Sequence, residues 1–120
     1  MAKKILVVDD SATVRQQVRL ALEQANFAVL EAVDGEDGAE KILSMDDIAL
    51  VICDVNMPRM NGLEMLEAVE AGKRGLPILM LTTEGQPALM QRAKAAGAKG
   101  WVVKPFKPAL LVAAIQKLAS

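Results

Sequence analysis

Five short apolar runs are spaced along the chain, and longer stretches of mixed polarity separate them. The runs are residues 5–8, 27–30, 49–53, 78–81 and 101–103. The first, third and fourth runs lack polar alternation, which is typical of strands that helices cover on both faces of a parallel sheet. We therefore predict five β-strands at these positions.

The intervening stretches carry the periodicity and the end signals of α-helices. Ser11 is a suitable N-cap for a helix whose apolar face consists of Val14, Val18, Ala21, Leu22 and Ala25. Asn61 and Glu64 resemble a capping box that opens another helix, and Gly72 is expected to end it. Further boundary signals are first-turn prolines and a glycine stop after Ala96: Pro87, Pro108 and Gly97.

Strict alternation of strand and helix predicts a doubly wound α/β sandwich of the flavodoxin-like type, with a five-stranded parallel sheet and five helices. A length of 120 residues fits one domain that spans residues 1–120. The last predicted helix, 109–118, is followed almost at once by Ser120, which favours a complete chain over a fragment.

Composition removes several classes of chemistry. The chain has no His and no Tyr, and Cys53 is its single Cys, so an internal disulfide, a Cys/His zinc site and a His general base are all excluded. The longest apolar stretch, 109–115, is far shorter than the ~18 residues of a membrane span. The apolar run before Asp9 is too brief for a signal peptide, so we expect a cytoplasmic protein without a membrane partner.

Charge is distributed unevenly along a chain whose net charge is −1. No acidic residue follows Glu84, whereas several basic residues do: Arg92, Lys94, Lys99, Lys104, Lys107 and Lys117. Because aromatic residues make up only 2% of the chain, this surplus favours a solvated basic face over a nucleic-acid surface.

Polar residues follow four of the five predicted strands. They are Asp9, Asp10 and Ser11 after the first strand, Asp54 after the third, Thr82 after the fourth and Lys104 after the fifth. The second strand ends on Glu31 and Ala32 and is expected to offer little. Since ligands of doubly wound folds bind at the carboxyl ends of the strands, these groups should converge on one edge.

Three neighbouring carboxylates, from Asp9, Asp10 and Asp54, would repel one another, and a divalent cation would relieve that repulsion. Oxygen-only ligands favour Mg²⁺, for which Mn²⁺ could substitute. A carboxylate beside such a metal is a nucleophile toward phosphorus when Lys104 and Thr82 hold the phosphoryl oxygens. Asp54 is therefore the predicted phosphoacceptor.

Each of these residues also has a simpler structural interpretation. In that interpretation, Asp10 and Ser11 serve merely to cap a helix, and Thr82 caps the next one. Lys104 is then an ordinary surface lysine. Agreement among four strand ends favours a site over four unrelated structural roles.

The motifs at these strand ends resemble the receiver domain of two-component response regulators. They are Asp9-Asp10, Cys53-Asp54-Val55-Asn56-Met57-Pro58, Asn61-Gly62, Thr82 after Leu81, and Lys104-Pro105-Phe106, and the resemblance covers the whole chain. It implies that Asp54 is phosphorylated and that Asp10, Asp54 and the main-chain carbonyl of Asn56 bind Mg²⁺, with Asp9 reaching the ion through water. It also implies that Thr82 and Lys104 contact the phosphoryl group and that the Lys104–Pro105 peptide is cis.

Within that family, the chain is most similar to stand-alone chemotaxis regulators of the CheY type. Trp101 stands where the family's mobile aromatic residue is usually Tyr or Phe, which puts the geometry of a Thr82–Trp101 switch in question. The resemblance implies a monomeric phosphoacceptor that catalyses only its own phosphorylation and dephosphorylation. A histidine kinase would be the phosphoryl donor, and a phosphatase would be a further partner.

The output implied by the resemblance is a surface formed by residues 87–96, 100–106 and 108–118, which would bind the flagellar motor switch protein. The alternatives within the family are a phosphate shuttle or interaction module of another pathway, and a receiver cut from a longer regulator or hybrid kinase. Two rivals outside it fit less well. A flavodoxin-like nucleotide carrier would not place Asp9-Asp10 beside phosphate, and a haloacid dehalogenase-type phosphohydrolase would need Asp-x-Asp there.

Overall fold

The computed structural model describes residues 3–55, 61–70, 75–82, 87–104 and 106–119. Within these residues the strands are β1 (Lys4–Val8), β2 (Ala28–Ala32), β3 (Ile48–Cys53), β4 (Ile78–Thr82) and β5 (Ala98–Val103). The helices are α1 (Ala12–Gln24), α2 (Gly35–Ser44), α3 (Gly62–Ala68), α5 (Pro87–Ala95) and α6 (Pro108–Leu118). The strands form one sheet in the order β2-β1-β3-β4-β5, and every neighbouring pair is parallel. The predicted fold class is confirmed.

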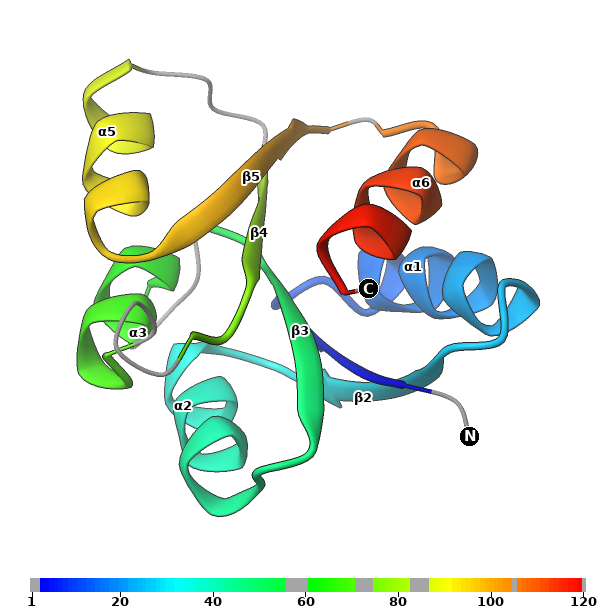
Figure 1. Ribbon diagram of the computed structural model, residues 1–120, viewed down its shortest axis with the longest axis horizontal. Helices are drawn as coiled ribbons and strands as arrows, with labels where there is room; N and C mark the ends of the chain where they lie inside the picture. Colours follow the sequence, from blue (N-terminus) through cyan, green and yellow to red (C-terminus); the bar gives the residue numbers. More distant parts are fainter. Residues whose placement is uncertain (1–2, 56–60, 71–74, 83–86, 105, 120) are drawn as a thin grey trace.

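Helices cover both faces of this sheet, so that the described chain has three layers (Figure 1). Helices α1 and α6 lie side by side on one face, while α2, α3 and α5 lie on the other. Side chains alternate between the two faces along β1: Ile5 and Val7 join the apolar cluster under α1 and α6, and Leu6 and Val8 join the opposite cluster. This double burial explains why the strands lack polar alternation.

The order of the strands reverses at β1, since the chain first adds β2 on one side of it and then β3 on the other. The helices that follow β1 and β3, α1 and α3, therefore lie on opposite faces of the sheet (Figure 1), and ligands of doubly wound folds bind beside such a point of reversal. Asp9 and Asp54 follow these two strands directly.

Several helix boundaries agree with the sequence signals and others differ. Ser11 caps α1 by accepting a hydrogen bond from the amide of Val14, and α6 begins at Pro108 as expected. Helix α3 ends at Ala68 rather than at Gly72, because Glu70 adopts a left-handed φ of 51° that turns the chain away. Asp34 was not anticipated; it caps α2 by accepting a 2.8 Å bond from the amide of Asp37.

Strand β5 begins at Ala98, three residues before the apolar run 101–103 that predicted it. Its first residues pair with β4 through the backbone, with Ala98 opposite Ile78, so the ladder extends into a segment that contains Lys99 and Gly100. Within the described residues, no helix is long and apolar enough to cross a membrane.

Candidate functional site

The carboxyl ends of β1 and β3 bring two buried acidic residues together. Asp9 is 1% exposed and Asp54 is 6% exposed, whereas the neighbouring Asp10 is exposed to solvent. One carboxylate oxygen of each of these three residues lies within 4.8 Å of the others. The predicted convergence of Asp9, Asp10 and Asp54 on one edge of the sheet is therefore confirmed.

Lys104 follows β5 and reaches across this edge to the two buried carboxylates. Its Nζ donates to Asp9 Oδ2 at 2.9 Å and to Asp54 Oδ2 at 3.2 Å, and its side chain is 16% exposed. Burial alone would lower the pKa of Lys104, but the hydrogen bonds and charges of Asp9 and Asp54 outweigh it and raise the pKa. The ammonium group stays charged and offsets part of the repulsion among the carboxylates.

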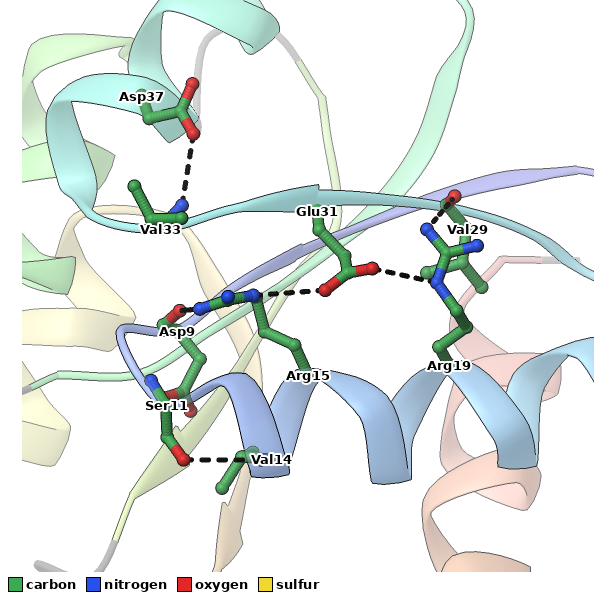
Figure 2. A network of polar contacts seen from close by, with 9 residues as sticks. All are labelled: Asp9, Ser11, Val14, Arg15, Arg19, Val29, Glu31, Val33 and Asp37. Carbon is green, nitrogen blue, oxygen red and sulfur yellow. Dashed lines mark hydrogen bonds and ion pairs between the residues drawn. The ribbon is translucent and has the colours of Figure 1, made fainter.

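Asp9 is held at each of its polar positions. Its amide donates to the carbonyl of Ala32 at 3.1 Å, and its carboxylate accepts the amide of Ser11 at 2.9 Å as well as the Lys104 ammonium. Its main-chain carbonyl accepts a 2.7 Å bond from Nη1 of Arg15, which Figure 2 shows reaching across from α1. A buried carboxylate with a hydrogen bond to each of its oxygens is held in one position.

Glu31 at the end of β2 contributes more than the sequence suggested. Its carboxylate accepts hydrogen bonds from Nε of Arg15 at 3.0 Å and from Nε of Arg19 at 2.8 Å (Figure 2). Burial raises the pKa of Glu31, but the bonds to the two arginines outweigh it and lower the pKa. Sequence reasoning did not anticipate these ion pairs; the available signal was a pair of arginines four residues apart on a helix that packs beside this strand.

The start of α3 lies against the main chain of Asp54. A Cβ atom on Gly62 would stand 2.2 Å from the Asp54 carbonyl oxygen and 3.0 Å from Sγ of Cys53, so only glycine fits there. The predicted capping box is present, with Asn61 accepting the amide of Glu64 at 2.9 Å. The Asn61-Gly62 motif thus sets how closely α3 approaches the Asp54 backbone.

Trp101 lies in β5 and is partly buried against the apolar cluster beneath α2, α3 and α5. Its indole Nε1 is buried and has no hydrogen-bond partner among the described residues. The ring also lines a cavity of about 310 Å³, together with Met90, Gln91, Lys94 and Lys99. The buried, unpartnered indole N–H and the adjoining cavity set Trp101 apart from the rest of β5, and the predicted switch role of this residue stays a prediction.

Other predicted site residues fall outside what the structure describes. Asn56 and Pro105 are not among the described residues, and neither is the predicted cis peptide at Pro105. Thr82 is the last residue of β4, which places its backbone at the same edge of the sheet; its side chain is not described. The roles predicted for these residues stay predictions.

The described donors of the acidic cluster are all oxygens, which fits a hard cation. Cys53 lies next to Asp54, but its thiol donates to the Asp54 carbonyl at 3.2 Å. Burial and the nearby carboxylates raise the pKa of this thiol far above its usual value, so it stays neutral and is a poor metal ligand. The residues present therefore suit Mg²⁺ or Mn²⁺ better than a thiophilic metal.

Comparison with proteins of known sequence yields chemotaxis regulators. The chain is 42% identical over 111 residues to the chemotaxis protein CheY1 of Helicobacter pylori, and the aligned region covers 90% of each protein. It is 41% identical over 111 residues to the chemotaxis protein CheY homolog of Campylobacter jejuni, covering 90% of this chain and 85% of the relative.

Solved structures agree. Chemotaxis protein CheY4 of Vibrio cholerae has a TM-score of 0.90 and 42% identity, covering 98% of this chain and 99% of that one. A BeF3-activated DrrB receiver domain has a TM-score of 0.85 and 27% identity, covering 98% of this chain and 97% of that one. Residues 5–116 match the family described as response regulator receiver domain. The chain therefore belongs to the response regulator receiver domain family, and the relatives named above at 41–42% identity are chemotaxis proteins of the CheY type.

Proposed function

We propose that the chain is a phosphorylation-activated signalling switch in which Asp54 accepts a phosphoryl group from a histidine kinase. The observation that carries this proposal is the position of Asp54: it is 6% exposed, clustered with two further carboxylates, and 3.2 Å from the Lys104 ammonium. The Asp54 carboxylate pairs with Lys104, but it also lies beside two like charges, which is a costly arrangement without a bound cation. It is well placed to react with an electrophilic phosphorus.

In the transfer step, an Asp54 carboxylate oxygen forms a bond to phosphorus. The bond between phosphorus and the donor's imidazole nitrogen breaks, and its electron pair stays on that nitrogen. Lys104 and the hydroxyl of Thr82 hold the phosphoryl oxygens. Asp9, Asp10, Asp54 and the main-chain carbonyl of Asn56 would hold Mg²⁺, which neutralises charge on the phosphoryl group; Mn²⁺ substitutes for it.

The phosphoryl group then changes the conformation at the ends of β4 and β5. Its oxygens draw the Thr82 hydroxyl inward, and Trp101 turns into the space that this leaves. The surface made by residues 87–96, 100–106 and 108–118 changes with it. The phosphoryl group shifts this equilibrium only by its differential affinity for the two states, typically ~1 to 3 kcal/mol.

The proposed target of that surface is the flagellar motor switch protein. An acidic segment of that partner would bind the surplus of basic residues on α5 and β5. Chemotaxis relatives at 41–42% identity support this choice. We further propose one receiver domain over residues 1–120, a monomeric state, a phosphatase partner and a cytoplasmic location. A phosphate shuttle or interaction module in another pathway is the competing function, and binding of the phosphorylated chain to the switch protein would separate the two.

The phosphoacceptor is tested by intact mass after incubation with acetyl phosphate and Mg²⁺. The wild-type chain should gain the mass of one phosphoryl group, and Asp54→Asn should gain none. Asp47→Asn is the matched control, because Asp47 is a half-exposed aspartate that pairs with Lys4 outside the acidic cluster. Labelling of Asp54→Asn at the wild-type rate would contradict the assignment.

A further inference from the structure

Arg15 joins three elements of the fold through two hydrogen bonds. Its side chain leaves α1 and is 14% exposed. Nη1 donates to the main-chain carbonyl of Asp9 at 2.7 Å, just beyond β1, while Nε donates to Glu31 Oε1 at 3.0 Å, on β2 (Figure 2). A planar guanidinium that is bonded at two points has little freedom to rotate, so it is a rigid support for the carbonyl that it holds.

The carbonyl of Asp9 is part of the peptide unit that joins Asp9 to Asp10. Because that unit is planar, a hydrogen bond to its oxygen restrains how the whole unit can tilt, and with it the direction in which the Asp10 backbone departs. Asp10 is the exposed member of the acidic cluster, and the other two members are buried. Arg15 thus acts on the carboxylate with the least packing around it.

Charge and position predict opposite consequences for Arg15. A fixed positive charge near an acidic cluster weakens the binding of a cation, so charge alone would make its removal strengthen binding. If Arg15 instead supports the Asp9–Asp10 peptide, its removal should weaken cation binding. The ligands would then depart from the geometry that a small cation requires. The sign of the effect therefore tells the two roles apart.

Arg19 provides an internal comparison. It lies one helical turn after Arg15 on α1 and binds the same carboxylate, with Nε 2.8 Å from Glu31 Oε2. Its remaining bonds go to the carbonyl of Val29 at 3.2 Å and to Glu23 at 3.2 Å, and none of its bonds reaches Asp9. The two arginines share a helix, a charge and a partner, and differ in the contact with the site.

The geometry points to Arg15 as a positioning residue for the metal site, held in place by Glu31. The inference rests on the proposed function, since it assumes that Asp9, Asp10 and Asp54 bind a divalent cation. It adds the end of β2 to the support of that site and assigns Glu31 a part in it.

The test compares Arg15→Met with Arg19→Met in the full chain. We expect Arg15→Met to raise the Mg²⁺ dissociation constant about tenfold in a calorimetric titration with magnesium chloride alone. Arg19→Met should stay within about twofold of wild type. In the metal-free protein, amide hydrogen exchange at Asp10 and Ser11 should accelerate in Arg15→Met only. Arg15→Lys keeps the charge and forms one bond instead of two, so its dissociation constant should be intermediate.

An unchanged or lower dissociation constant in Arg15→Met overturns the inference, and so does equal weakening in the two Met variants, which would mark a general effect of α1 packing. Should Arg15→Met fail to fold, Arg15→Lys decides: a weakened affinity in that variant supports the inference, and wild-type or tighter affinity overturns it. Failure of the proposed function is seen separately, as phosphorylation of Asp54→Asn. A wild-type chain that binds no Mg²⁺ overturns the inference together with the metal part of that function.

Discussion

The edge of the sheet that carries the acidic cluster has two halves that are built differently: the ends of the central strands β1 and β3, and the end of the border strand β5. Residues 5–8 of β1 and 50–53 of β3 are at most 1% exposed. None of the six residues of β5 is fully buried, and Val103 at its end is 51% exposed. The first half lies in the middle of the sheet under helices on both faces, and the second half lies at the sheet's border.

In the proposed function, this difference would separate a rigid phosphorylation site from a more adjustable output surface. Asp9 and Asp54 directly follow central strands of the sheet and are themselves buried, which suits the proposed site for a cation and a phosphoryl group in defined geometry. Trp101 sits on the border strand with an unsatisfied indole N–H beside a cavity. We propose that small changes at the acidic cluster are coupled to a rearrangement of Trp101.

The largest expected contrast concerns the two strands themselves. Ile52→Ala should lower the free energy of unfolding by about 3 kcal/mol, because it leaves a cavity in a fully buried strand. Val103→Ala should lower it by about 0.5 kcal/mol or less, since that side chain is half exposed. Urea denaturation measures both, and equal losses would remove the distinction between the halves.

A second contrast uses one glycine from each half. Gly62→Ala should destabilise the chain by about 2 kcal/mol and slow phosphorylation, because the new Cβ would meet the Asp54 main chain, which cannot yield. Gly100→Ala should be nearly neutral: its Cβ would meet Cδ1 of Leu79 at 2.7 Å, the end of a side chain that can rotate away. A neutral Gly62→Ala would show that α3 is free to shift.

Within the first half, the two neighbouring aspartates should differ in their effect on the metal. Asp10→Asn should weaken Mg²⁺ binding by about tenfold, or about 1.4 kcal/mol, and Asp9→Asn by less, because Asp9 is already bonded to Ser11 and Lys104. Asp10→Asn should also raise the stability of the metal-free chain, because it removes repulsion without breaking the ion pair between Asp9 and Lys104. Calorimetric titration measures the affinity, and equal affinity in wild type and Asp10→Asn would contradict the ligand assignment.

The smallest effect is a pH dependence at the end of β2. The folded protein holds the pKa of Glu31 below its usual value, so its ion pairs stabilise the fold above about pH 4.3 and lose that contribution as pH falls through the lowered pKa. Glu31→Gln should therefore be less stable than wild type at pH 7, by about 1 kcal/mol or less because the side chain is 33% exposed. Thermal unfolding at a series of pH values should show the two proteins converging in acid; a constant gap would contradict the pKa assignment.

The sequence predicted most accurately where local pattern and global fold impose the same constraint. The apolar runs located β1, β3 and β4 within a residue, and the residues after β1, β3 and β5 led to Asp9, Asp54 and Lys104. The ion pairs of Glu31 were not predicted, because its partners come from another element and a single glutamate at a strand end does not indicate them. Helix α3 ends early because Glu70 has a left-handed backbone conformation. A glutamate does not predict that conformation from sequence.

The coupling between the halves is tested most directly through the fluorescence of Trp101, which is the only Trp in a chain without Tyr. Beryllofluoride with Mg²⁺ stands in for the phosphoryl group on Asp54. Its addition should change Trp101 emission in wild type, leave it unchanged in Asp54→Asn, and change it much less in Thr82→Ala. An identical change in wild type and Thr82→Ala, or any comparable change in Asp54→Asn, would contradict transmission from Asp54 through Thr82 to Trp101.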